Sequence, residues 1–255
     1  MFSIPRSMLE GFEQVAFQRY QQGLIFHIRE YLPGHATYLS EQQLLRVIQR
    51  GCELAEGHGF KTERDLCLYT DLTLMLGSGF DSDPQLEWVP EILKEPVLVD
   101  PRSRMDALWD QAMDYMDHIL GPGGVFPKRA YRKDRSQKDR WRRMVGIGRL
   151  TATDEEALLS YFDDIWPEKA RYVGGTALRT LIREGRKTAE GYGIRNGVGQ
   201  AEFLIHAFLF GHQFHADPQY PWAHDVLGDE KVSYDQEKIV RMVKAFDEHL
   251  NEALS

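Results

Sequence analysis

One twelve-residue phrase occurs twice in this chain, at residues 77–88 and again at 211–222. Both copies read G-x-x-F-x-x-D-P-Q-x-x-W, and corresponding residues are 134 positions apart. At this offset the match extends without a gap over 33–93 and 167–227, with 17 identities in 61 pairs. About 4 identities are expected from ordinary composition. The sequence therefore predicts a tandem duplication, and each half of the chain has to fold in a similar way.

The conserved letters of the phrase predict structure rather than chemistry. An Asp before a Pro is a common helix start, since the carboxylate accepts free N–H groups at the N-cap and Pro suits the first helical position. Asp100, also followed by Pro, repeats the device. We interpret Asp83 and Asp217 as N-caps, and expect Trp88 and Trp222 in equivalent buried places. The repeated positions are Gly77, Phe80, Asp83, Pro84, Gln85 and Trp88, then Gly211, Phe214, Asp217, Pro218, Gln219 and Trp222.

Every periodic segment of the sequence has the spacing of a helix, and none alternates as a strand does. Ser40 with Gln43 forms a capping-box pattern, and Thr62 is placed to cap the helix that follows. Thr153 with Glu156 suggests the same start for the first helix of the second half. We predict an all-α fold with about five helices in each unit.

Glycine and proline divide the chain into three parts. The run Gly-Pro-Gly-Gly at 121–124 interrupts the helical pattern. We therefore expect a first helical unit over 1–121, a basic linker over 122–149 and a second helical unit over 150–255.

The linker carries most of the positive charge of an acidic protein. Residues 125–149 contain ten Lys or Arg and two Asp, a net charge of +8, whereas the whole chain has −8, which leaves −16 for the rest. An acidic remainder argues against nucleic-acid binding by the folded units. The linker is interpreted as a strap across both units or, in order of preference, as an arm that docks an acidic partner or contacts nucleic acid. Its candidate partner-binding residues are Arg140, Arg142 and Arg143.

Four histidines of the second half, His206, His212, His215 and His224, are close in sequence. A zinc site needs three or four such ligands that converge. Their spacing matches no zinc signature, and the corresponding positions of the first half hold no histidine. We predict no metal site and interpret them as surface or interface residues.

The first half offers five acidic residues around its copy of the phrase: Asp71, Asp81, Asp83, Glu87 and Glu91. Paired carboxylates serve general acid–base catalysis in many enzymes. The second half does not repeat the set, so a solvated acidic helix face is the interpretation that we favour.

No motif for nucleophilic or cofactor chemistry stands out. Cys52 and Cys67 are predicted to be reduced, largely buried thiols with no histidine partner evident in the sequence. There is no G-x-S-x-G elbow, and the glycine-rich run 191–199 follows no strand. The sequence thus predicts no catalytic, cofactor-binding or metal-binding residues.

Composition is that of an ordinary globular protein, with 42% hydrophobic and 27% charged residues. No apolar run reaches the roughly 18 residues of a membrane span, and the N-terminus lacks the apolar core of a secretory leader. We expect a cytoplasmic protein without a membrane partner.

One stretch also carries a family resemblance. It begins Glu63-Arg64-Asp65, continues to Leu76-Gly77 and ends Phe80-x-x-Asp83-Pro84-Gln85-Leu86-x-Trp88. In this stretch the chain resembles uncharacterised bacterial helical proteins that are typically encoded beside type VI secretion spike and PAAR-toxin genes. The second copy has Pro221 where the first has Glu87. The resemblance implies no catalytic residues.

What the resemblance implies is a non-catalytic protein-binding role: an adaptor or chaperone for a secreted toxin or a secretion spike component. One alternative is an immunity protein that neutralises a cognate toxin. The other is an enzyme with an unrecognised site between the two units, for which a deep pocket with convergent polar groups would be the sign.

Overall fold

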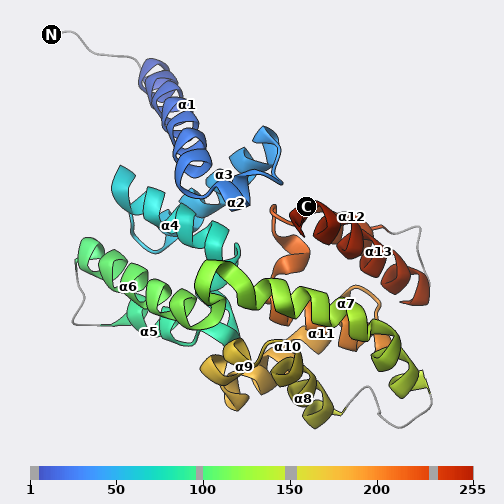
Figure 1. The fold of residues 1–255 in the computed structure, drawn as a ribbon. Coiled ribbons are helices and arrows are strands. Elements are labelled where there is room, and N and C mark those ends of the chain that lie inside the picture. The colour runs from blue at the N-terminus through green and yellow to red at the C-terminus, as the bar shows by residue number, and fades with distance from the viewer. Residues whose placement is uncertain (1–5, 96–99, 147–153, 230–234, 255) are drawn as a thin grey trace, which may run out of the picture.

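The computed structural model describes residues 6–95, 100–146, 154–229 and 235–254, all of them helical or in turns (Figure 1). Side chains within the helices are described except at 6–14, 137–146, 235–236 and 250–254. No strand occurs in the described ranges, so the predicted all-α class is confirmed.

Among the described residues, six α-helices belong to residues 1–121, which we call the first half, and six to residues 150–255, the second half. The first half contains α1 (Arg6–Tyr31), α2 (Pro33–Ala36), α3 (Glu41–Gly57), α4 (Glu63–Leu76), α5 (Trp88–Lys94) and α6 (Pro101–Leu120). The second contains α8 (Glu155–Ile165), α9 (Pro167–Val173), α10 (Gly175–Gly191), α11 (Gly197–Phe210), α12 (Pro221–Leu227) and α13 (Asp235–Leu254). Short 3₁₀ helices are η1 (Phe80–Ser82), η2 (Pro84–Leu86), η3 (Pro122–Gly124) and η4 (Phe214–Ala216).

The expectation of about five helices per unit missed two short ones, α2 and α9. Each begins with proline at its first position, directly after a longer helix ends. Proline is favoured there because its missing N–H is not needed and its φ is already helical. In both places the residue before the proline, Leu32 or Trp166, has non-helical backbone angles, so the proline starts a separate helix.

The predicted helix starts follow the side-chain chemistry of the caps. Ser40 accepts the N–H of Gln43 and donates its own N–H to the Gln43 side chain, which completes the capping box. Thr62 caps α4 through the N–H of Asp65. The prediction for α8 was wrong by one position: Asp154, not Thr153, accepts the first free N–H, and Thr153 lies outside the described residues.

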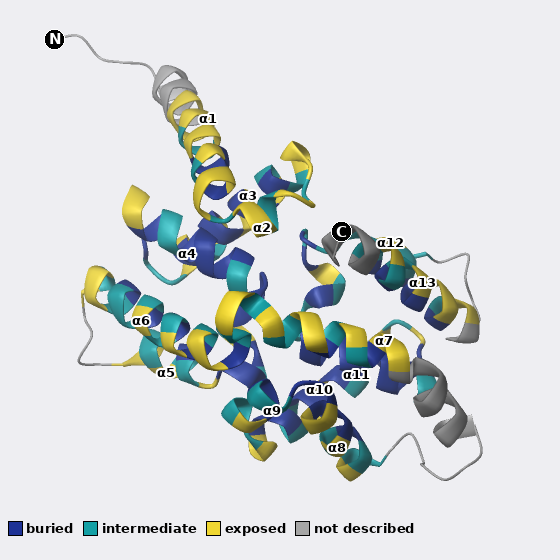
Figure 2. Cartoon of the chain, viewed as in Figure 1, coloured by how far each residue is buried: buried dark blue, intermediate teal, exposed yellow. Residues whose placement is uncertain are grey.

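Two helices form the centre of the core. In α11 every residue from Gly199 to Phe210 is buried, and in α4 most are (Figure 2). Small residues bring the neighbouring helices close to them: a Cβ on Gly51 would lie 3.0 Å from Thr70 Oγ1, and one on Gly185 would lie 2.5 Å from the Leu204 side chain. Helix packing therefore places the C-terminal ends of α4 and α11 in the interior.

The basic segment is a helix, α7 (Val125–Gly146), which crosses the body of the molecule next to α6, α8 and α11 (Figure 1). Its beginning contacts the second half. Tyr131 stacks on Phe210 with ring centres 5.8 Å apart, and Lys133 donates to Asp164 at 2.7 Å. Arg140, Arg142 and Arg143 fall within α7, but their side chains lie outside the described part of the chain.

Among the described residues, no helix has the length and apolar character needed to cross a membrane.

Candidate functional site

The two copies of the repeated phrase contact each other across the middle of the molecule. Asp83 accepts the N–H of Gln85, which is the predicted N-cap contact, at 2.8 Å. Its other oxygen accepts the N–H of His212, in the second half, at 2.9 Å. Asp217 reciprocates: it accepts the N–H of Gln219 at 2.9 Å and that of Ser78, in the first half, at 2.7 Å.

The glutamines of the phrase extend this exchange. Gln85 donates its amide to the carbonyl of Ala207, and Gln219 donates to the carbonyl of Thr73, at 3.1 and 3.0 Å. Both carbonyls lie in the last turn of a buried helix, and each also accepts the N–H of the glycine that ends that helix, Gly211 for Ala207 and Gly77 for Thr73. Each glutamine therefore adds a second hydrogen bond at the end of a helix that belongs to the other half.

The glycines allow the close approach that these bonds need. Gly77 and Gly211 have φ of +97° and +99°, where a side chain is strained. A Cβ on Gly77 would lie 3.1 Å from the carbonyl oxygen of Phe210, and one on Gly211 would lie 3.2 Å from an Asp83 carboxylate oxygen. The phrase is thus an interface between the halves, and the interpretation of its aspartates as simple N-caps was incomplete.

The tryptophans that end the phrase are less buried than expected. Trp88 and Trp222 are both intermediate in exposure, and the indole N–H of each is shielded from solvent with no hydrogen-bond partner in the described part of the chain. Their shared environment is the edge of the core rather than its centre.

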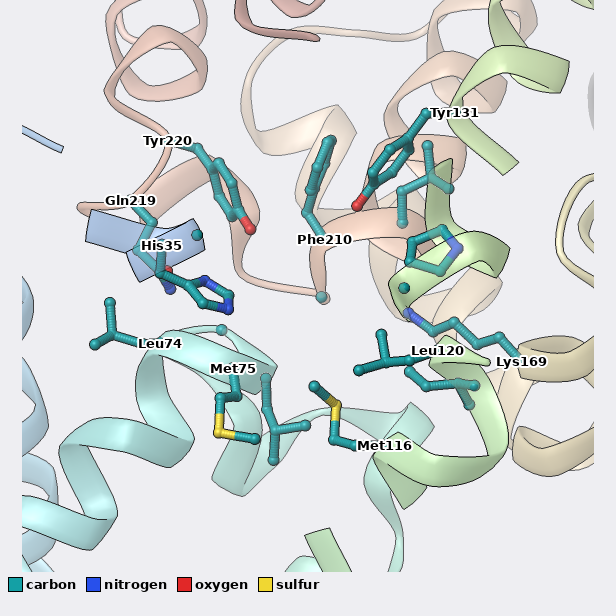
Figure 3. Close-up of a pocket in the computed structure, with 18 of the residues that line it drawn as sticks. His35, Leu74, Met75, Met116, Leu120, Tyr131, Lys169, Phe210, Gln219 and Tyr220 are labelled. Atoms are coloured by element: carbon teal, nitrogen blue, oxygen red, sulfur yellow. The ribbon is translucent and has the colours of Figure 1, made fainter. Parts of the chain in front are cut away.

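A cavity of about 450 Å³ lies beside this interface, between the two halves and under the start of α7 (Figure 3). The phrase residues Gly77, Asp83, Gln85, Gly211 and Gln219 contribute to its wall. Its volume is within the range of small-molecule sites in proteins.

Most of the lining is apolar or aromatic. Met75, Met116 and Leu120 form one side, and the ring of Phe210 lies opposite them (Figure 3). Tyr131 and Tyr220 flank Phe210, and their hydroxyl groups point into the cavity. Burial raises the pKa of Tyr131 to about 12, so its phenol is a neutral hydrogen-bonding group.

Lys169 is the principal charged group of the site. It comes from α9, is only 5% exposed, and directs its ammonium toward the cavity (Figure 3). The Nζ atom donates to the carbonyl of Phe208 at 2.5 Å and lies 5.1 Å from the ring centres of Trp166 and Phe208. Burial lowers the pKa of Lys169 to about 8, against the opposing effect of the Asp83 charge.

His35 faces the cavity from α2, across from Lys169 (Figure 3). Burial lowers the pKa of this imidazole, so it is neutral at pH 7. His35 and Lys169 occupy matching sequence positions, each two residues after the proline that begins its short helix.

Three of the four histidines of the predicted cluster have separate environments. His212 approaches Asp83, with Nδ1 and carboxylate oxygen 3.6 Å apart, and is an interface residue as expected. His215 bonds the Tyr192 hydroxyl at 3.0 Å, and His224 is exposed beside Asp225. His206 is fully buried among aromatic rings, so the interpretation as a surface or interface residue was wrong for it.

The predicted solvated acidic face was also wrong for three residues. Asp71 and Asp83 are buried, and Asp81 is half-buried. Although burial opposes ionisation of Asp81, hydrogen bonds from His58 and Tyr69 outweigh it and hold the pKa of this carboxyl below its usual value. Partners inside the protein account for the carboxylates of Asp81 and Asp83, whereas Asp71 has a partner for only one of its two oxygens among the described residues.

Neither a family model, nor a curated protein, nor a solved structure matches the chain. The site therefore has to be interpreted from its own geometry.

Proposed function

We propose that the chain binds a small apolar molecule with an anionic group, such as a carboxylate, in the cavity between its halves. The observation that carries this proposal is the buried ammonium of Lys169. Among the described residues it has no ion-pair partner, and its hydrogen bond goes to a neutral carbonyl.

Charge balance favours an anionic ligand. A buried cation is costly unless it is paired. Asp83 is the carboxylate that acts electrostatically on Lys169, and both its oxygens already accept N–H groups from Gln85 and His212. A ligand carboxylate at Nζ would form a charge-assisted hydrogen bond in a weakly solvated place, where such bonds are strong.

The rest of the lining favours an apolar ligand body. Phe210, Met75 and Met116 offer polarisable surface, and methionine side chains adapt to ligands of different outline. The hydroxyls of Tyr131 and Tyr220 are placed to bond a second polar group on the ligand. Aryl or medium-chain aliphatic carboxylic acids combine these properties.

The test compares matched ligands on the full chain by calorimetry. An acid should bind more tightly than its amide or alcohol of equal carbon skeleton, and Lys169→Met should remove that preference. Lys238→Met is the control, because Lys238 also donates to backbone carbonyls, of Tyr192 and Leu227, but away from the cavity. An equal preference in wild type and Lys169→Met would refute the proposal.

An enzymatic role is a second candidate, favoured by the lowered pKa of Lys169. A lysine with a pKa near 8 is partly neutral under mild conditions and can attack a carbonyl carbon to form an imine with loss of water. Borohydride treatment in the presence of an apolar aldehyde would then leave a stable mass increment on Lys169. No increment on this residue would exclude the imine route.

The adaptor or chaperone role is a third candidate, favoured by α1. Figure 2 shows this helix projecting from the body with much of its length exposed. Phe26 is 71% and Tyr31 65% exposed, and large exposed apolar side chains that lie together are typical of protein-binding surfaces.

Replacing Phe26 and Tyr31 by Ser should abolish co-purification of a protein partner, such as a secreted toxin or spike component. Charge reversal at Arg140, Arg142 and Arg143 tests whether α7 contributes to the same contact. An unchanged partner in all variants would contradict this role.

We further propose that the two halves arose by tandem duplication. Support comes from matched elements: α3, α4, η1 and α6 begin 134 residues before α10, α11, η4 and α13, and the members of each pair have the same length. An experimental structure in which these pairs do not superpose under one rotation would contradict it.

A further inference from the structure

Three side chains with metal-binding atoms meet between α1 and α4, away from the cavity. His27 comes from α1, and Cys67 and Asp71 come from one face of α4, a single turn apart. One imidazole nitrogen, the thiol sulfur and one carboxylate oxygen all lie within 4.8 Å of one another. His27 Nε2 and Asp71 Oδ2 are 2.9 Å apart.

A second observation points to a missing partner. Asp71 is 4% exposed, and its Oδ1 atom is shielded from solvent with no hydrogen-bond donor among the described residues. Buried carboxylate oxygens are nearly always satisfied. The bond from His27 accounts for Oδ2, but nothing within the described part of the protein accounts for Oδ1.

We propose that His27, Cys67 and Asp71 bind a divalent transition-metal ion of the zinc class, with water as the fourth ligand. Zn²⁺ accepts imidazole nitrogen, thiolate sulfur and carboxylate oxygen at about 2.0–2.3 Å. A contraction of the cluster by side-chain rotation would replace the His27–Asp71 hydrogen bond with two bonds to the metal. The mixed donor set and the open fourth position resemble those of catalytic zinc sites more than those of closed structural ones.

The protonation of the Cys67 thiol distinguishes this cluster from the site of a nucleophilic cysteine. Burial, with the charge of Asp71 and the proximity of Cys52, raises the pKa of Cys67 to about 12. A thiol that is protonated at pH 7 is a poor nucleophile, whereas a bound metal displaces its proton. The half-exposed His27 ring leaves a route for the ion from solvent.

The site belongs to the first half alone. At the 134-residue offset its ligands correspond to Tyr161, Ala201 and Ile205, of which none is a strong metal ligand. Metal binding would therefore distinguish the two halves.

The test uses the reduced, metal-free full chain titrated with Co²⁺, which reports thiolate coordination by a charge-transfer band in the near ultraviolet. We expect saturation at one equivalent and loss of the band on addition of Zn²⁺. Cys67→Ser should abolish the band, and Asp71→Asn should weaken Co²⁺ binding at least tenfold. Cys52→Ser is the matched control, since Cys52 is a buried thiol outside the cluster, and should retain band and stoichiometry.

The proposal is overturned if no band develops at a tenfold excess of Co²⁺, or if the band survives in Cys67→Ser. Helical circular dichroism shows whether each variant is folded. Should Asp71→Asn lose helicity, His27→Gln replaces it, because His27 is only partly buried. Unchanged Co²⁺ affinity in that variant would count against the site.

Discussion

Asp83 and Asp217 each accept a backbone N–H from the half of the chain to which they do not belong. Asp83 takes that of His212 and Asp217 that of Ser78, at 2.9 and 2.7 Å. The same carboxylates cap the turns that follow them in their own half. The aspartate of each copy of the phrase therefore fixes both the turn that follows it and the placement of its half against the other.

Removing either carboxylate should destabilise the protein strongly. Asp83→Ala and Asp217→Ala each leave buried N–H groups without acceptors in both halves. Hydrogen bonds to charged groups contribute about 1.5–3 kcal/mol each, so we expect the free energy of unfolding to fall by ~3 kcal/mol. Urea denaturation followed by circular dichroism measures it.

The control for that loss is Asp100→Ala. Asp100 also precedes a proline and accepts the N–H of Ser103, but it is exposed, and its side-chain hydrogen bonds within the described ranges go to Ser103 of its own half. Its removal should lower the free energy of unfolding by clearly less than removal of Asp83 or Asp217 does.

The double variant of Asp83 and Asp217 tests whether the two residues are coupled. The sum of the losses in the two single variants should exceed the loss measured for the double variant, because the first substitution already loosens the shared interface. Strict additivity would contradict the reciprocal arrangement.

Gly77 and Gly211 should be intolerant of alanine. Each combines a positive φ with a Cβ position that meets the backbone or a carboxylate of the other half. We expect a loss of at least about 1–3 kcal/mol, the usual cost of one strained backbone residue. Gly23→Ala is the contrast: it lies inside α1 with nothing within 4 Å of its Cβ, so the free energy of unfolding should rise by up to about 1 kcal/mol. Thermal and urea melts of the three variants decide the matter.

Local chemistry made much of the fold predictable. The caps at Ser40, Thr62 and Asp100 were evident because their partners lie three residues away in the sequence. The short helices α2 and α9 were missed because a proline after a helix is as compatible with a new start as with an end. The reciprocal bonds of the phrase were also missed, since a repeat shows recurrence and not where the copies lie in space.

The candidate site was less predictable than the fold. Lys169 has no motif around it, and only its match with His35, at the same distance from a repeated proline, distinguishes it in the sequence. Its burial and its position beside Phe208 depend on the packing of α9 against the end of α11. Likewise, Asp71 looks like part of a solvated face until α1 covers it with His27.

Aromatic packing, rather than ion pairs, should hold α7 in place. Tyr131→Ala removes a ring stacked on Phe210, and we expect a loss of about 2 kcal/mol. Lys133→Ala removes a partly exposed pair with Asp164, for which the expected loss is below about 1 kcal/mol. Urea melts at low and at 1 M salt should show the first loss unchanged and the second reduced. A larger loss in Lys133→Ala than in Tyr131→Ala would show that ion pairs contribute more than aromatic packing to the attachment of α7.

Lys169 should make the stability of the protein depend on pH in the alkaline range. Its pKa is about 8 in the folded protein, whereas that of an unperturbed lysine side chain is 10.5. Between these values the unfolded chain holds more protons than the folded one, so the free energy of unfolding rises with pH. The slope that this group adds to the free energy of unfolding approaches ~1.4 kcal/mol per pH unit within that window. Below the window the slope is zero, and the full penalty of burying the ammonium persists.

The measurement is the difference between wild type and Lys169→Met in urea melts from pH 7 to pH 9.5. The difference cancels other groups, including the tyrosines, whose raised pKa values act above that range. Lys169→Met should be the more stable protein at pH 7, provided that the methionine fills the same space, and its advantage should shrink as the pH rises above 8. Added carboxylate ligand should reverse the sign at pH 7, because it stabilises only the protein that keeps the ammonium. A difference that does not vary with pH would mean that Lys169 is solvated in the cavity, and the charge argument for an anionic ligand would fail with it.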